Sequence, residues 1–213
     1  MAILQRYKNR EAFQIFTIYL RYLIGGAFVF AGVGKLMGGR FIPAGSMQIP
    51  TEGMVLDVFF ETLFRTGIWW RFIGFGQVIA GLLLVTQRWS TLGAILFLPI
   101  SLNVFLITIS MDFRGTPIVT GLILLGNLWL LLWDYMRLKI LLYPNRNVET
   151  VVPVTSDQLG VPFIWESQGL LIFFISISFG NRSNFLLWVT LCLLTGLVGL
   201  IFFKIYRARQ KGS

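Results

Sequence analysis

Two basic residues, Arg21 and Lys35, lie inside the first long apolar segment of the chain. Their spacing corresponds to about 21 Å along an α-helix, which places them near the two boundaries of a lipid bilayer. An ionisable side chain within a membrane-spanning segment marks a functional site by default, unless its long stem carries the charge to the interface. Two interpretations therefore stay open for each residue. It is an anchor at the interface, or it contacts a ligand, a lipid headgroup or a partner within the chain.

Three amide side chains, Gln77, Asn103 and Asn127, interrupt three further apolar segments. If they converge inside a helix bundle, hydrogen bonds between helices account for them, each contributing about 0.6–2 kcal/mol in lipid. The alternative is a polar site that binds a quinone carbonyl or a lipid hydroxyl, with Trp70 and Lys35 beside it. The candidate ligand-binding residues are Lys35, Trp70, Gln77, Asn103, Asn127 and Arg21.

Charged residues also recur between the first two apolar segments, at the helical spacing i, i+4, i+8 within residues 51–66. This segment is amphipathic, and Glu61 precedes Arg65 by four residues, a favourable order for an ion pair. We expect an interfacial or re-entrant helix over the outer mouth of the bundle. Its carboxylates and Asp112 are candidate partners for Lys35, whereas Asp112 and Arg114 are expected to form a surface pair. The predicted outer-face polar cluster is Asp57, Glu61, Arg65, Asp112 and Arg114.

The elements that must position these residues are membrane-spanning helices. Of the 213 residues, 56% are hydrophobic and 13% are charged, far fewer charges than in an average soluble domain. Each apolar segment approaches the roughly 20 residues that cross a bilayer as a helix. The fifth segment is the weakest, because Pro162, Glu166 and Gly169 interrupt its first half. The six predicted spans are residues 13–36, 69–85, 91–110, 117–133, 162–179 and 185–206.

The distribution of Lys and Arg predicts the orientation of the bundle. With six crossings and a cytoplasmic N-terminus, eleven of the cations fall inside and six outside, while Arg21 lies within a span. This excess on one side agrees with the positive-inside rule, and it places both termini in the cytoplasm. The net charge of +9 is then a signature of topology, with anionic lipid as a further contact, and nucleic-acid binding is not expected. We expect the chain in the cytoplasmic (inner) membrane.

Composition excludes several kinds of chemistry. The chain has no histidine and one cysteine, Cys192. Histidine-ligated metals and haem, histidine acid–base catalysis and a redox cysteine pair are therefore absent, and we predict no metal site and no catalytic residue. The predicted organisation is a four-helix unit over 1–142, a cytoplasmic linker over 143–161, and a C-terminal helical hairpin with a basic tail over 162–213.

Small residues follow one another along the first segment, "GAFVFAGVGKL". At helical spacing Arg21, Gly25, Phe28, Gly32 and Lys35 share one face. Because small residues let helix backbones approach closely in lipid, we expect this helix to be central and tightly packed. In the fourth segment, Thr120, Asn127 and Asp134 share a face.

The stretches "RYLIGGAFVFAGVGKL" and "GFGQVIAGLLLVTQRWSTLGAILFLPISLNVF" resemble the DoxX family of membrane proteins. The resemblance covers residues 13–140 and rests on Gly32–Leu36, on Gly81 and Leu82, and on the turn at Gln87 and Arg88. It implies a four-helix membrane bundle, and some members are linked to quinone-coupled oxidation of thiosulfate or to thiol-stress complexes beside a soluble partner. Gln77 stands where the family carries an acidic residue, and an amide cannot relay a proton as a carboxylate does.

Three functions follow as hypotheses. The first is a non-catalytic integral membrane subunit or assembly factor, with membrane lipids and another membrane or membrane-associated protein as partners and a lipid or quinone as the candidate ligand. The second is a quinone-linked oxidoreductase subunit, which the family resemblance suggests. The third is a small-molecule transporter, which Arg21 and the interrupted fifth segment suggest.

Overall fold

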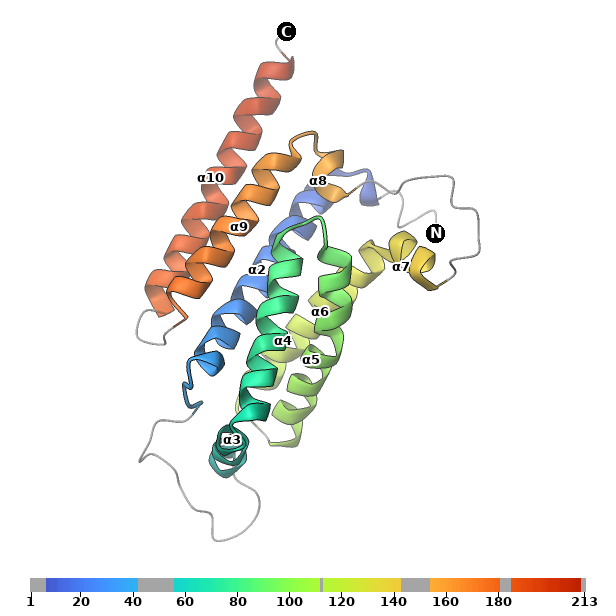
Figure 1. The fold of residues 1–213 in the computed structure, drawn as a ribbon. Coiled ribbons are helices and arrows are strands. Elements are labelled where there is room, and N and C mark those ends of the chain that lie inside the picture. The colour runs from blue at the N-terminus through green and yellow to red at the C-terminus, as the bar shows by residue number, and fades with distance from the viewer. Residues whose placement is uncertain (1–6, 42–55, 112, 143–153, 181–184, 212–213) are drawn as a thin grey trace.

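The protein is an antiparallel bundle of α-helices (Figure 1). The computed structural model describes residues 7–41, 56–111, 113–142, 154–180 and 185–211. Within these ranges no strand occurs, which agrees with the all-α class expected from the apolar segments. The helices are α2 (Glu11–Leu36), α3 (Leu56–Arg65), α4 (Ile68–Val85), α5 (Ser90–Ser110), α6 (Thr116–Trp133), α7 (Tyr135–Leu142), α8 (Thr155–Gln158), α9 (Pro162–Ser178) and α10 (Phe185–Lys211).

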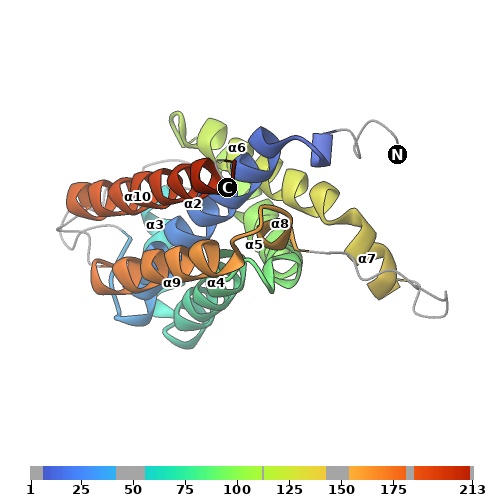
Figure 2. The ribbon, with the colours of Figure 1, turned by 90° about the horizontal axis from the view of Figure 1, so that it is seen from above.

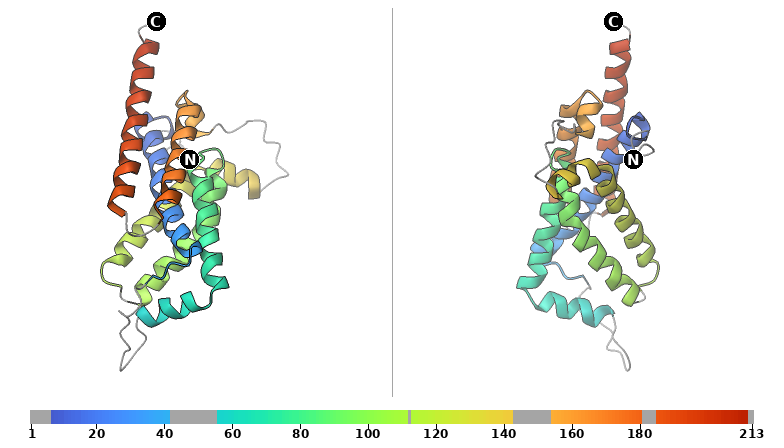
Figure 3. Two further views of the ribbon diagram at one scale, coloured as in Figure 1. Left: turned by 60° about the vertical axis from the view of Figure 1, so that its left-hand side comes forward. Right: turned by 90° about the vertical axis from the view of Figure 1, so that its right-hand side faces the viewer.

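Five of these helices are long and apolar enough to cross a membrane, namely α2, α4, α5, α6 and α10. The sixth expected span is the shorter helix α9, with 17 residues, or about 25 Å at 1.5 Å per residue. It runs antiparallel to α10 along the bundle (Figures 1 and 3). An ion pair of 2.7 Å joins Arg207 of α10 to Glu11 of α2, so the last turns of α10 lie beside the start of α2. We call this end of the bundle the Arg21 end and the opposite end the α3 end.

Helix α2 packs against α4 at the distance of backbone contact. A Cβ atom added to Gly81 would lie 2.6 Å from the carbonyl oxygen of Gly25, and one added to Gly25 would lie 2.8 Å from that of Gly81. Two turns further on, Gly32 and Gly74 form the same reciprocal contact at 2.7 and 2.8 Å. The two pairs confirm the expectation that the glycine face of the first helix is tightly packed.

Helices α5 and α6 pack together through the polar face predicted for α6. Thr120 lies 2.8 Å from Thr108, with either hydroxyl able to donate, and Asn127 donates to the carbonyl of Ala94 at 3.3 Å. Beyond this face, α7 continues from α6 and points away from the bundle (Figure 2). The sequence patterns did not predict α7.

The C-terminal pair α9 and α10 is fastened by side chains that donate to carbonyls of α10. Tyr19 donates its hydroxyl to Gly196 at 2.6 Å, and Gln168 donates its amide to Thr195 at 2.6 Å. Gly199 leaves the space that the Gln168 amide occupies, because an added Cβ would collide with that amide. A core of buried apolar side chains lies between α2, α8, α9 and α10 and contains Ile18, Tyr22, Leu159, Trp165, Ile172 and Phe203.

Of the two connections predicted from sequence, the first contains the helix that was expected there, and the second has more structure than expected. Helix α3 lies across the α3 end of the bundle (Figure 3), within the predicted amphipathic segment; residues 51–55 of that segment lie outside the described ranges. Residues 143–153 of the predicted linker also lie outside them. Its remainder, however, is not a solvated linker, because it forms α8 and buries Thr155, Ser156 and Leu159. The predicted start of the C-terminal hairpin at residue 162 coincides with the first residue of α9, and the expectation that changes is that the segment before it is a mere connection.

Substituting Gly81→Ala tests the α2–α4 contact. The added methyl group would meet the backbone oxygen of Gly25 and a methyl of Val29 at 2.7 Å, so the helices must separate, at a cost of about 1–3 kcal/mol. We expect a lower melting temperature of the purified protein. Gly76→Ala is the matched control in the same helix, since its methyl would meet only Ile100 at an ordinary 3.7 Å. Equal melting temperatures for the two variants would contradict the close contact.

Candidate functional site

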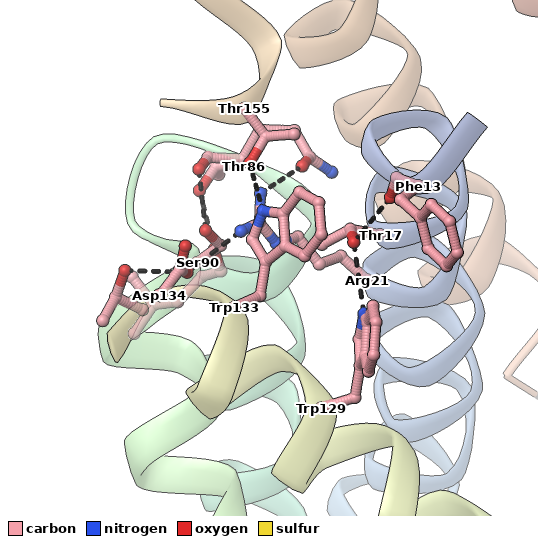
Figure 4. A network of polar contacts seen from close by, with 12 residues as sticks. Phe13, Thr17, Arg21, Thr86, Ser90, Trp129, Trp133, Asp134 and Thr155 are labelled. Carbon is pink, nitrogen blue, oxygen red and sulfur yellow. Dashed lines mark hydrogen bonds and ion pairs between the residues drawn. The ribbon is translucent and has the colours of Figure 1, made fainter. Parts of the chain in front are cut away.

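A buried ion pair between Arg21 and Asp134 lies at the centre of the Arg21 end (Figure 4). The guanidinium Nη2 of Arg21 lies 2.9 Å from Oδ2 of Asp134, and Nη1 donates to Oε1 of Gln87 at 3.0 Å. The Asp134 oxygen also accepts from the hydroxyl of Thr91 at 2.9 Å. Arg21 and Gln87 are completely buried. One guanidinium thus joins α2 to the α4–α5 turn and to the end of α6.

Local chain geometry brings these groups together. Gln87 has a φ of +60°, a left-handed conformation that non-glycine residues rarely adopt. It lies in the short turn between α4 and α5, and its carbonyl accepts the hydroxyl of Ser90 at 2.9 Å. Asp134 is the C-cap residue of α6. Because Arg21 lies one turn before Gly25, the close α2–α4 contact carries its side chain to the end of α4.

Two tryptophans of α6 extend this network toward α2 and α8 (Figure 4). Trp129 donates its indole N–H to Thr17 at 3.2 Å, and Trp133 donates to Thr155 at 3.0 Å. Gln14 connects α2 to α8 through a 3.2 Å bond to Gln158. The residues of α8 therefore cover the Arg21 end, which explains why the expected linker packs against the bundle.

Several buried polar atoms of this network lack a partner among the described side chains and backbone. They are Nε of Arg21, Nε2 of Gln87 and Oγ of Ser156. All three can donate a hydrogen bond. Since buried polar groups are almost always paired with protein or ordered water, we expect water molecules or an acceptor group at this end.

Lys35 lies at the α3 end, against an aromatic ring. Its ammonium is 5.3 Å from the centroid of the Trp70 ring and donates to the carbonyl of Ala31 at 3.2 Å. Trp70 is buried and donates its indole N–H to Gly39 at 3.1 Å. Of the predicted ligand-binding residues, Lys35 and Trp70 are thus in contact, whereas Arg21 belongs to the opposite end.

The three predicted amides do not converge. Gln77 and Asn127 are buried, with 3% and 0% of their surface exposed. The side chain of Asn103 is exposed, because it lies on the face of α5 that turns away from α4 and α6. The expectation that Asn103 joins an interior polar site is therefore wrong. Oε1 of Gln77 and Oδ1 of Asn127 are buried without a partner among the described atoms.

The outer-face polar cluster is centred on Glu61. Its carboxylate bonds to Arg65 at 2.9 Å, which confirms the predicted pair, and lies 3.4 Å from Arg40. Asp57 is half-buried and Arg114 is exposed. Asp112 lies outside the described residues, so its predicted pairing with Arg114 stays a prediction.

Sequence reasoning missed the partners of Arg21. Asp134 was placed on the correct face of α6, but its pairing with a residue 113 positions away had no local signal. Of the tryptophans near the ends of the helices, Trp70 and Trp133 are buried, while Trp69 is 53% exposed. In the described ranges, no three His, Cys, Asp or Glu side chains come together in a metal-binding arrangement. The chemistry of the Arg21 end is therefore that of a positive charge neutralised between three helices.

Comparisons with known proteins give one weak relative. An uncharacterized protein of Bacillus subtilis (strain 168), YwoB, is 28% identical over 113 residues, which cover 53% of this chain and 72% of the relative. No protein-family model matches the chain, and no solved structure matches it. The similarity to YwoB therefore indicates common ancestry over about half of the chain and carries no function.

Removing one member of the Arg21–Asp134 pair should be far more damaging than removing both. Arg21→Met leaves a buried carboxylate without its counter-charge, which costs about 3–5 kcal/mol. The double variant Arg21→Met with Asp134→Asn carries no buried charge and keeps an acceptor for Thr91. We expect low yield and a lower melting temperature for Arg21→Met, and recovery of most of the loss in the double variant. A double variant as unstable as the single one would show that the pair is not the stabilising interaction.

Proposed function

We propose that this chain is a non-catalytic, DoxX-like subunit or assembly factor of a membrane protein complex, resident in the cytoplasmic membrane with both termini in the cytoplasm. The charge bias along the sequence supports the orientation, and the glycine and turn motifs support the family. The start of α2 lies beside the end of α10, where Glu11 pairs with Arg207. The chain thus enters and leaves the bundle at the same end, which agrees with an even number of crossings.

The observation that carries the proposal is that the buried polar side chains form hydrogen bonds and an ion pair with neighbouring helices. Arg21 and Thr91 both donate to the carboxylate of Asp134, and Gln168 and Tyr19 donate to backbone carbonyls of α10. Each of these groups fixes the position of one helix relative to another. A bundle built in this way is suited to be a rigid membrane element that a partner protein recognises.

Fractionation of native membranes tests the proposal. Extracted in a mild detergent, the chain should migrate on native gels as a complex larger than its 24.2 kDa plus a micelle, with one other polypeptide at a fixed ratio. Deleting the gene should reduce the abundance of that same polypeptide, because subunits without their partner are degraded. A chain that migrates alone in native membranes and shows turnover by itself would refute the proposal.

A quinone-linked subunit is the second candidate, and Gln77 favours it. Its buried Oε1 has no partner among the described atoms, and it lies one helix turn from the glycines that bring α4 against α2. A quinol hydroxyl could donate to this oxygen, with Lys35 and Trp70 two turns away toward the α3 end of α4.

Lipid extracts of the purified protein decide this alternative. We expect a bound quinone at a constant ratio to protein in the native chain, loss of that quinone in Gln77→Leu, and retention in Asn103→Leu. The second variant is the matched control, because it removes an amide whose side chain is exposed. Extracts of the native chain without quinone would exclude the alternative.

A further inference from the structure

Asn103 is a polar side chain on the outer surface of a helix long enough to span the membrane. It lies three residues, or about 4.5 Å at 1.5 Å per residue, from the midpoint of α5 (Ser90–Ser110), so in a bilayer it is far from either interface. Its side chain is exposed, whereas the face that carries Gly93 and Ala94 packs against α4 and α6. Among the described residues, none forms a hydrogen bond with this amide.

An amide that faces hydrocarbon is costly unless its donors and acceptor are bonded. A hydroxyl in such a position can bond to its own helix. Thr190, which is exposed within α10, donates in this way to the carbonyl of Leu186 at 2.8 Å. Asn103 has two N–H donors and a carbonyl acceptor, and it makes no such bond within α5. We therefore expect its partner to come from outside the chain.

The exposed side chains around Asn103 form a stripe with the spacing of a coiled-coil seam. Successive members are separated by four and three residues in alternation, which is the a and d pattern of a heptad repeat. In this pattern Asn103 takes an a position between apolar neighbours. Membrane helices mostly cross at the angle of soluble coiled coils, so such a stripe suits a second helix that carries the same pattern. The members of this α5 stripe, all exposed, are Leu92, Leu96, Pro99, Asn103, Leu106 and Ser110.

A second copy of the chain is the occupant that fits the α5 stripe. Copies of one membrane protein share the orientation that their cations dictate, so two α5 helices related by a two-fold axis along the membrane normal run parallel. A two-fold interface brings each residue near the axis against the same residue of the other copy. Because an amide both donates and accepts, Asn103 is complementary to Asn103 of the second copy at the same depth. A single asparagine at an a position fixes register and oligomeric state in this way.

We propose that the α5 stripe is a homodimer interface within the membrane, in which the amide of Asn103 hydrogen-bonds to its counterpart. Helix α5 lies apart from α9 and α10 (Figure 2), so this pairing leaves the C-terminal helices free. The dimer does not depend on the proposed function, because its second member is this chain itself and not a different protein.

Disulfide cross-linking of the purified full-length protein in lipid vesicles tests the interface. In a Cys192→Ser background, Leu96→Cys places a thiol in the stripe. Leu102→Cys is the matched control, because the two leucines are 42% and 44% exposed but point in directions about 120° apart at 100° per residue. We expect an oxidant to convert most of the Leu96→Cys protein into a species of twice 24.2 kDa, and little of the Leu102→Cys protein.

Substitution of Asn103 tests the amide itself. Asn103→Leu should weaken association about 3–30-fold, the effect expected for losing an interhelical hydrogen bond in lipid, while the exposed position leaves the melting temperature unchanged. Asn103→Gln keeps an amide and should retain most of the association. Energy transfer between donor-labelled and acceptor-labelled copies, followed over a range of protein-to-lipid ratios, measures the effect.

Two results would overturn the dimer in the purified protein. One is equal cross-linking of the Leu96→Cys and Leu102→Cys variants, and the other is association that Asn103→Leu leaves unchanged. In native membranes, a Leu96→Cys cross-link to a different polypeptide, with none between copies, would assign the stripe to another protein and refute the dimer.

Discussion

The contact between the backbones of α2 and α4 is the constraint on which the rest of the structure depends. Glycines at 25 and 32 meet glycines at 81 and 74 without side chains between them, so the two helices have one possible register. That register brings Arg21 to the end of α4 and leaves the other sides of α2 for α6, α9 and α10. In lipid, where apolar side chains gain nothing by leaving solvent, such close packing supplies much of the association energy.

The register also explains how a guanidinium is tolerated inside the bundle. A buried charge without a partner is unstable, and removing one partner of a buried pair is among the most destabilising changes known. Here the α4–α5 turn and the end of α6 arrive on either side of Arg21, so Gln87 and Asp134 each accept one of its terminal nitrogens. The left-handed backbone at Gln87 is stabilised because its side chain and its carbonyl are both bonded. The polar network thus follows from the helix register, and in turn fixes it.

Sequence alone predicted the parts of this structure that depend on local periodicity. The apolar segments, the glycine face of α2, the polar face of α6 and the Glu61–Arg65 pair all follow from residues within one or two turns of one another. It did not predict the pairing of Arg21 with Asp134, because nothing in the sequence of either helix specifies which other helix packs against it. For the same reason Asn103 was assigned to the interior: a helix that is apolar on every side gives no sign of which face meets protein and which meets lipid.

The two ends of the bundle are held by interactions of different strength. At the α3 end, the ammonium of Lys35 lies over Trp70 and the guanidinium of Arg40 lies 4.9 Å from the centroid of Phe64; contacts of this kind contribute about 0.5–2 kcal/mol each. At the Arg21 end, the charged pair is buried, and removing one member would cost about 3–5 kcal/mol because the other charge would be left without its partner. Local opening is easiest where the stabilising contacts are weakest and most exposed. Helix α3 is held by contacts of exposed side chains and by the ion pairs of Glu61, whereas the Arg21 end is held by buried ones, so we expect a binding event that alters the shape of the protein to act at the α3 end.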